Sequence, residues 1–309
     1  VLDADLSDDI KWKILASNAI DFYGLDLEVG EDQPLPEIEV PITPAIDVHN
    51  HLGTMPNMSA TIRDADAISQ LALKAGMEYS VCSSYIGYYD DLDAGNREML
   101  DAITARPRLL GSPVVSPTHF ENSIHWLNMF EKNDKLAHAT LMIDTVRERP
   151  GSDEYMNLFA EAAKRNVPIF LNGPNWDNVR LLQWPTGPAR APFENRSASS
   201  NVLDMLIEVY RRHPNLPIIV GHGMGDDGLW LVKHTKNVYL EHSGTYPEPG
   251  YLRESIDKAG KERIVFGSDL DFIKPAYALG VYRDAEMTPE EDRLIMAENS
   301  RGILRMPKN

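Results

Sequence analysis

The sequence is poor in the features that mark several common classes of protein. It has a single cysteine, Cys82, which excludes an internal disulfide and a cysteine metal cluster, and a reducing, cytoplasmic setting is expected. No apolar run approaches the roughly 20 residues that span a bilayer. There are only 30 basic residues against 47 acidic ones, a net charge of −17. This deficit of positive charge argues against nucleic acid or an anionic membrane as the main partner.

Short apolar runs alternate with amphipathic segments from residue 42 onwards. With 309 residues and 43% hydrophobic composition, the chain can bury a large core, as two domains or as one large α/β barrel. Strands are expected at 40–48, 78–83, 109–115, 140–143, 168–172, 217–222, 238–241 and 263–268. Helices are expected near 64–75, 94–104, 122–134, 152–165, 200–212, 226–234 and 249–259. Eight such units predict a (β/α)8 TIM barrel. The alternative, an open doubly wound sheet, would normally have a glycine-rich turn after its first strand, which residues 49–53 lack.

The first 41 residues are expected to form a helical extension that precedes the barrel domain of residues 42–309. Ser7 can cap a helix over residues 7–25 and Gly24 can end it, whereas residues 26–41 are acidic, contain three prolines and suit a connector. Residues 13–19 line up with residues 294–300, and Asn18 and Asn299 occupy the same place in the two segments. Residues 1–25 could therefore be the tail of an upstream barrel or an element that docks on a neighbouring subunit. A homo-oligomer is expected, since oligomers are common for this fold.

A histidine pair ends the first expected strand, in the motif Asp47-x-His49-x-His51. Side chains two residues apart on a strand point the same way, so the two imidazoles share a face and can share a metal ion. Asp47 behind them could accept the second N–H of a histidine and fix its tautomer. Two polar residues at the solvent end of an edge strand would show the same pattern, so the residues that follow later in the chain decide between the two interpretations.

Polar residues also end four of the later expected strands. Barrel enzymes build their active sites at this end of the strands, so these residues are expected to converge on the histidine pair. They are Asn172 after the fifth strand, His222 after the sixth, Glu241 and His242 at the seventh, and Asp269 after the eighth. At most one of Glu241 and His242 can point inward, because successive residues on a strand face opposite ways.

Taken together, Asp47-x-His49-x-His51, Gly221-His222-Gly223 and Phe266-Gly267-Ser268-Asp269 resemble the amidohydrolase superfamily. The resemblance covers residues 42 to 305 and is strongest to the amidohydrolase-related branch of decarboxylases and pyrone-dicarboxylate lactonase. It implies a distorted (β/α)8 barrel in which His49 and His51 bind a divalent metal, zinc in the first place and manganese as the alternative. It also implies that Asp269 is a further metal ligand or the catalytic base, and that His222 polarises the substrate carbonyl or moves protons.

Asn172 departs from the family pattern, because metal-binding members usually have a histidine there. An amide oxygen is a poorer zinc ligand than imidazole and suits harder cations, so Asn172 would bind the metal weakly or the metal would be absent. Glu241 or His242 could replace the missing ligand. Three alternatives therefore stay open: a metal-dependent enzyme, a metal-independent lactone hydrolase that uses the same pocket, and a noncatalytic binding relative.

Substrate contacts are expected from aromatic and arginine side chains at the mouth of the barrel. The long segment after the fifth strand contains Trp176, Arg180, Arg190 and Arg196, which could cover a flat ring and bind a carboxylate; Tyr85 and Glu241 are further candidates. Arginines that pair with surface acids would look the same in an acidic protein. The predicted function is a hydrolase or nonoxidative decarboxylase that acts on a small carboxylated, cyclic or aromatic substrate, with Asp269 and His222 as catalytic residues.

Overall fold

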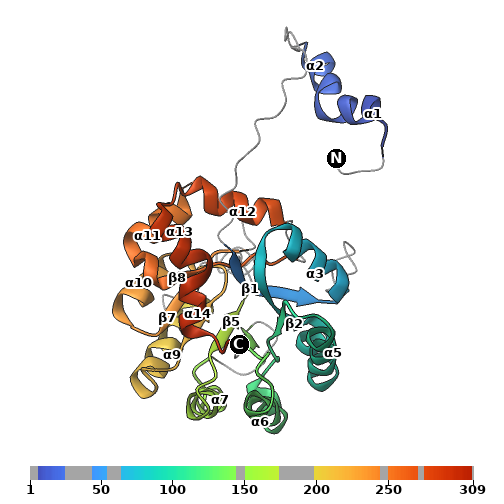
Figure 1. Ribbon diagram of the computed structural model, residues 1–309. Coiled ribbons are helices and arrows are strands. Elements are labelled where there is room, and N and C mark those ends of the chain that lie inside the picture. The colour runs from blue at the N-terminus through green and yellow to red at the C-terminus, as the bar shows by residue number, and fades with distance from the viewer. Residues whose placement is uncertain are drawn as a thin grey trace, which may run out of the picture. The chain divides into compact units, whose positions relative to one another are not determined.

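The computed structural model describes residues 6–24, 44–53, 64–143, 150–173, 198–243, 250–270 and 275–307 (Figure 1). The chain divides into two compact units, residues 1–41 and residues 42–309. Within the described parts of both units, no helix combines the length and the apolar character needed to cross a membrane.

The second unit is built on eight parallel strands, as predicted. They are β1 (Ala45–Leu52), β2 (Met77–Ser84), β3 (Leu109–Gly111), β4 (Ala139–Met142), β5 (Ile169–Asn172), β6 (Ile218–Val220), β7 (Val238–Glu241) and β8 (Ile264–Val265). One hydrogen-bonded ladder joins β1, β2 and β3 in that order, and a second joins β4, β5, β6, β7 and β8 in that order. Parallel bridges from Gly111 to Leu136 and from Val114 to Thr140 connect the two ladders. The ring closes where Val48 N donates to Phe266 O, and Asp269 N donates to His49 O at 2.8 Å.

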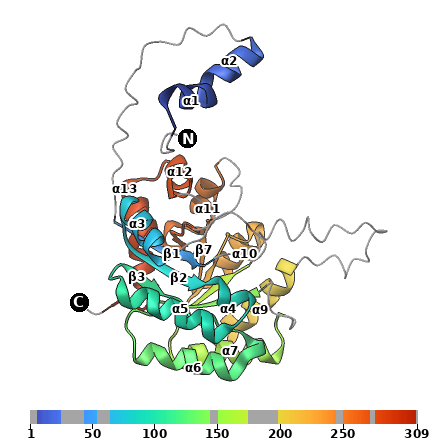
Figure 2. The same cartoon turned by 90° about the vertical axis from the view of Figure 1, so that its right-hand side faces the viewer.

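Helices surround the strands, as the view along the barrel shows (Figure 1) and as the rotated view confirms (Figure 2). They are α3 (Ala65–Lys74), α4 (Tyr85–Tyr89), α5 (Leu92–Ala105), α6 (Phe120–Asn128), α7 (Asp153–Lys164), α9 (Ala198–Arg212), α10 (Gly225–His234), α11 (Tyr251–Ala259) and α12 (Pro275–Asp284). The chain ends with α13 (Pro289–Arg293), the π-helical turn η6 (Leu294–Glu298) and α14 (Asn299–Ile303). Together with the strand order, this arrangement confirms the α/β barrel prediction and rules out an open doubly wound sheet.

The interior of the barrel is filled by apolar side chains from facing strands. Val48, Phe170, Ile219 and Val265 are buried together, and all eight residues of β1 are buried. Strands buried on both faces are expected where helices cover the outside of a parallel barrel. The core therefore holds the strand ends rigidly, and the residues at those ends are the ones free to carry chemistry.

Several expected boundaries were wrong by a few residues. β1 runs on to Leu52, so His49 and His51 lie inside the strand, and its register against β2 shifts between Asp47 and Asn50. Such an irregularity re-aims side chains and is frequent beside active sites. β6 ends at Val220 and β8 at Val265, before His222 and Ser268, and the backbone adopts a positive φ at His222 (59°) and at Asp269 (52°). The sequence pattern also missed α4 and α12.

The first unit contains one helical segment in its described residues 6–24. It consists of α1 (Asp8–Trp12), a π-helical turn η1 (Lys13–Ser17) and α2 (Asn18–Tyr23). The Ser7 hydroxyl accepts from Ile10 N, and Gly24 ends the helix with a φ of 58° that glycine adopts without strain. None of the side chains of this segment is buried within the unit.

Candidate active site

His49 and His51 lie side by side at the carboxyl end of β1. Each is 2% exposed, and their Nε2 atoms are 2.9 Å apart. Two nitrogens that each lie about 2.1 Å from one metal ion are about 3 Å apart when the angle at the ion is near 90°. The observed separation is therefore one that a shared ion accommodates.

Hydrogen bonds to the Nδ1 atoms orient both imidazoles. His49 Nδ1 lies 3.0 Å from Glu241 Oε2 and 2.9 Å from Ser243 Oγ, while His51 Nδ1 lies 2.9 Å from Ser83 Oγ. A carboxylate only accepts, so His49 Nδ1 carries the hydrogen, and Ser83 Oγ can accept from His51 in the same way. The Nε2 lone pairs of both rings then converge on one point, which is the arrangement that a metal-binding histidine pair needs.

Burial keeps the two imidazoles neutral. It holds the pKa of His49 and of His51 well below the usual range, and the neighbouring histidines lower both pKa values further. Neutral imidazole is the form that binds metal ions. The same burial raises the pKa of Glu241 above its usual value.

Asp269 completes a group of three possible ligands. Its Oδ1 lies 3.6 Å from His51 Nε2 and 3.9 Å from His49 Nε2, and the three ligand atoms are all within 4.8 Å of one another. A left-handed backbone at a non-glycine residue is uncommon and costs free energy, which the hydrogen bond from Asp269 N to His49 O helps to offset. Two neutral imidazoles and one carboxylate form a donor set that suits zinc or manganese, so these residues fit a divalent metal.

Asn172 occupies the end of β5 beside the histidine pair. Its Nδ2 lies 3.2 Å from both His49 Nε2 and His51 Nε2. In this orientation the amide can donate one N–H to each imidazole lone pair. Rotating the amide by 180° would present Oδ1 to the same point, so Asn172 can serve either as a neutral cap on the pair or as a weak oxygen ligand.

His222 follows β6 by two residues and lies beside His49. Its Nδ1 is 2.8 Å from Ser243 O and donates to it, and the ring centroids of His222 and His49 are 5.0 Å apart. With Nδ1 protonated, Nε2 is the nitrogen that can accept or donate a proton in a reaction. Glu241, His49 and His222 thus meet around Ser243.

Asp47 does not have the role predicted from its place in the motif. Its Oδ1 accepts from His49 N at 3.1 Å and from Ser268 N at 2.9 Å, and Ser268 Oγ donates to Oδ2. The carboxylate therefore joins β1 to the segment after β8 and touches neither imidazole ring. Complete burial raises its pKa to about 7. The partner of the His49 ring is Glu241, which lies 192 residues away in the chain.

Tyrosines of α4 form one wall of the site. The Tyr85 ring stacks on His51 with a centroid distance of 4.6 Å, and Tyr88 OH lies 2.5 Å from Ser83 Oγ. Beside them is a pocket of 330 Å³ whose lining includes Tyr88, His119 and Met142. An aromatic wall next to the histidine pair can cover a flat ring.

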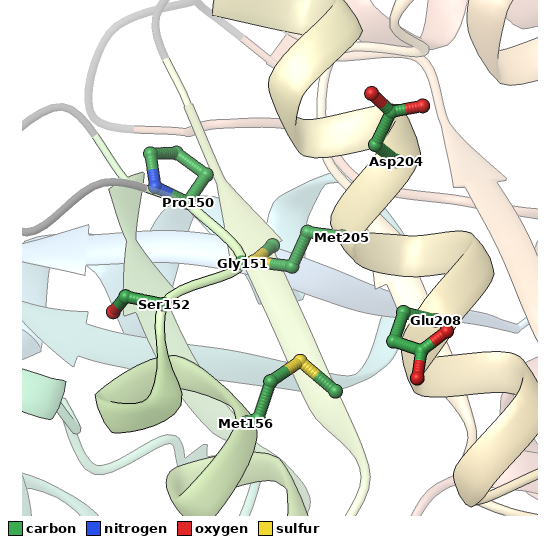
Figure 3. Close-up of a pocket in the computed structure, with 7 residues that line it drawn as sticks. All are labelled: Pro150, Gly151, Ser152, Met156, Asp204, Met205 and Glu208. Atoms are coloured by element: carbon green, nitrogen blue, oxygen red, sulfur yellow. The ribbon is translucent and has the colours of Figure 1, made fainter.

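The predicted contacts Trp176, Arg180, Arg190 and Arg196 lie outside the described residues. A second pocket, of 480 Å³, lies between the start of α7 and α9 and is lined by Pro150, Gly151, Ser152, Met156, Asp204, Met205 and Glu208 (Figure 3). Its titratable lining residues are both acidic, and none of its lining residues is basic. It therefore does not suit an anionic substrate.

Comparison with known proteins identifies the family. A family model described as Amidohydrolase matches residues 46–306. The chain belongs to the amidohydrolase family. The predicted membership and the prediction of an enzyme are therefore confirmed. No sequence among the curated proteins matches this amidohydrolase significantly.

Solved structures share its fold at low sequence identity. A dihydroxybenzoic acid decarboxylase from a Polaromonas species, with bound manganese and the inhibitor 2-nitroresorcinol, is 17% identical with a TM-score of 0.66, covering 84% of this chain and 96% of that one. A 5-carboxyvanillate decarboxylase from Sphingomonas paucimobilis is 14% identical (TM-score 0.63, covering 85% and 99%). A probable 2-pyrone-4,6-dicarboxylic acid hydrolase from Acinetobacter baumannii, with citric acid bound, is 15% identical (TM-score 0.59, covering 84% and 98%).

The sequence alone missed the serines that orient the histidines. Ser83 ends the strand expected at 78–83 and is the last residue but one of β2, and Ser243 follows β7 by two residues. The rule that singled out Asn172, a polar residue at a strand end, would also have found Ser83. Ser243 has no such signal, because its hydroxyl and carbonyl serve two histidines that are distant in the sequence.

Proposed function

We propose that this amidohydrolase is a metal-dependent hydrolase or nonoxidative decarboxylase of a small carboxylated compound with a cyclic or aromatic ring. The observation that carries the proposal is the convergence of His49 Nε2, His51 Nε2 and Asp269 Oδ1 within 4.8 Å. The solved relatives support the substrate class, because the dihydroxybenzoic acid, 5-carboxyvanillate and pyrone-dicarboxylic acid enzymes all act on carboxylated rings. The bound manganese of the Polaromonas enzyme supports the metal.

His49, His51 and Asp269 would hold the divalent ion, zinc or manganese, and Asn172 would contribute its amide oxygen after rotation. When bound, the ion supplies Lewis-acid chemistry that polarises an oxygen of the substrate. Glu241 and Ser83 keep the two imidazoles in the tautomer that offers Nε2. Tyr85 covers the ring of the substrate from the side of His51.

Asp269 and His222 carry the proton transfers in either reaction. In hydrolysis, Asp269 accepts the proton of the attacking water, and His222 donates to the oxyanion that develops on the carbonyl oxygen. In decarboxylation, the bond from the ring carbon to the carboxyl carbon breaks, CO2 leaves, and a proton from Asp269 or His222 is delivered to the ring carbon. Both reactions need one side chain that exchanges a proton and one that stabilises negative charge.

A metal-independent lactone hydrolase is the second candidate, and the position of Asn172 favours it. With Nδ2 3.2 Å from both imidazoles, the amide satisfies the two lone pairs without an ion. The same pocket would then bind the lactone carbonyl through His222 and activate water through Asp269. The pyrone-dicarboxylic acid hydrolase is the relative that supports this reaction class.

A substrate screen with metal-stripped and metal-loaded protein tests both candidates. Dihydroxybenzoates, 5-carboxyvanillate and pyrone dicarboxylates are the first compounds, with product formation followed by chromatography. The metal-dependent function predicts turnover that is lost with the metal and restored by zinc or manganese. Metal content below about a tenth of an equivalent, with activity indifferent to chelators, refutes it in favour of the second candidate.

The variant Asp269→Asn tests the catalytic assignment separately. General acid–base groups contribute roughly 10²- to 10⁴-fold to a rate, so we expect kcat to fall by at least 10²-fold. Turnover that survives the substitution would refute the role of Asp269. A compound that raises the melting temperature without being turned over binds the pocket but is not the substrate.

A further inference from the structure

The helical segment of the first unit has the same order of helical elements as the last helical segment of the barrel, and each element begins at the corresponding residue. α1, η1 and α2 begin at residues 8, 13 and 18, and α13, η6 and α14 begin at residues 289, 294 and 299. Ser7 and Thr288 are the corresponding N-caps. A single π-helical turn is rare and is frequently found at functional sites. The π turn lies at the same place in both segments, directly before Asn18 and before Asn299, so the two segments match in backbone structure as well as in sequence.

The last segment closes the barrel between β8 and β1. Asn299 Nδ2 donates to Lys261 O and to Ile264 O, both at 2.7 Å, and so ties the helix to the start of β8. Ile295 O accepts from Phe266 N at 3.1 Å, a bond that α-helical geometry would not leave available because the helix would use that carbonyl itself. The π turn therefore leaves the Ile295 carbonyl free to accept a hydrogen bond from Phe266, the residue that follows β8.

The same segment buries a short apolar face against the barrel. Ile295 and Met296 are buried with β8-side residues, and Ala297 packs into the cluster that fills the barrel interior. Ser300 is completely buried. The closing helix, residues 289–303, thus combines three features: a π turn, an apolar face, and the asparagine clamp formed by the two hydrogen bonds that Asn299 donates.

The first unit presents all three of these features without a partner in its described residues. Ile14, Leu15 and Ala16 correspond to the buried apolar face, and Asn18 corresponds to the clamp. Ile14 and Leu15 are each 52% exposed, and Phe22 is 82% exposed. A helix that shows its apolar face to water needs a surface to cover it.

The barrel of this chain has no room for a second closing helix, because its seam between β8 and β1 holds α13, η6 and α14. Within the described residues there are therefore two closing helices and one seam. A second copy of the chain would also bring two closing helices and one seam, so one helix of each copy would still lack a seam to cover. The surface that fits the first helix is the seam of a barrel that lacks its own closing helix.

We propose that residues 8–23 are the closing helix of a second amidohydrolase-type (β/α)8 barrel, formed by a polypeptide segment other than residues 44–307. Ile14, Leu15 and Ala16 fill the apolar seam of that partner barrel, and Asn18 Nδ2 donates to two of its backbone carbonyls. The carbonyl freed by η1 accepts a backbone N–H from the last strand of the partner.

A transplant within the full chain tests this assignment. Residues 289–303 are replaced by residues 8–22, and in a length-matched control by α9, a 15-residue amphipathic helix of the same chain that contains no π turn. We expect the first chimera to unfold cooperatively with a melting temperature within roughly 5 °C of the parent chain, and the control to be far less stable. A first chimera no more stable than the control overturns the proposal.

The asparagine clamp provides a second, sharper comparison. Asn299→Ala in the parent chain and Asn18→Ala in the transplanted helix should lower the melting temperature by similar amounts, roughly 5 °C or more, because each removes two hydrogen bonds. A transplanted Asn18→Ala without effect, where Asn299→Ala has one, overturns the proposed equivalence.

Hydrogen exchange on the unmodified chain distinguishes the partner. If the helix awaits a different barrel, the amides of residues 8–23 exchange rapidly at every protein concentration, while those of residues 289–303 stay protected. If protection of residues 8–23 rises with protein concentration, a second copy of this chain is the occupant and the proposed partner is wrong.

Discussion

Glu241→Gln is the substitution that most directly tests how the metal site is held. Glu241 Oε2 accepts from His49 Nδ1 at 3.0 Å and from Ser243 Oγ at 2.9 Å, and Oε1 accepts from Ser243 N. A glutamine has the same shape but one acceptor oxygen, so its amide nitrogen must face at least one of these donors. The variant therefore loses the carboxylate that keeps His49 Nδ1 protonated and Nε2 available.

The expected magnitude follows from two opposing contributions. Losing an outer partner of a metal-binding histidine typically weakens metal affinity by about 10- to 100-fold, which is about 1.4 to 2.8 kcal/mol. The lost hydrogen bonds also destabilise the fold, but burial raises the pKa of Glu241, so removing its buried charge offsets part of that cost. We therefore expect a larger effect on metal affinity than on the free energy of unfolding.

Metal affinity is measured by competition between the metal-stripped protein and a coloured chelator, with zinc and with manganese, and stability by urea unfolding. The matched control is Glu291→Gln on α13, where the carboxylate accepts from Arg253 and from Thr288 N, each at 2.8 Å. The control should lower stability and leave metal affinity unchanged. The reasoning is refuted if Glu241→Gln keeps its affinity within twofold, or if both variants lose affinity equally.

Three further outcomes are expected. Asn172→His should raise zinc affinity by about tenfold or more in the same competition assay, because imidazole is the better zinc ligand. Gly267→Ala should weaken metal binding as Glu241→Gln does, because its Cβ would lie 2.5 Å from the carboxylate of that glutamate; unchanged affinity would contradict this. Stability should fall as pH drops from 6.5 to 4. Burial lowers the pKa of His138 and of His242 to about 4 and holds the pKa of His49 and of His51 well below the usual range, so in the metal-stripped protein the unfolded chain binds four more protons there. Asp47, with a raised pKa of about 7, and Glu241, whose pKa is also raised, together bind at most two more protons in the native state. The excess of at least two protons lowers the free energy of unfolding by about 2.7 kcal/mol per pH unit near pH 5; a urea series with the opposite slope would refute the assignment.

Local patterns in the sequence were enough to predict the fold and the family. The apolar runs of a parallel barrel are continuous because both faces of each strand are buried, so they stand out from the amphipathic helices between them. The rule that barrel sites lie at the strand ends then selected His49, His51 and Asp269, and the structure brings these three together. The segment that contains Trp176, Arg180, Arg190 and Arg196 remains a prediction about substrate binding.

Only the tertiary structure decided which groups orient the site. The motif suggested that Asp47 would fix a histidine tautomer, but its carboxylate accepts from the backbone N–H groups of His49 and Ser268. Glu241 and Ser83 hold the imidazoles instead, and they come from two other strands, β7 and β2. Hydrogen bonds depend on positions within a few tenths of an ångström, which the closure of the barrel determines and a residue pattern does not encode.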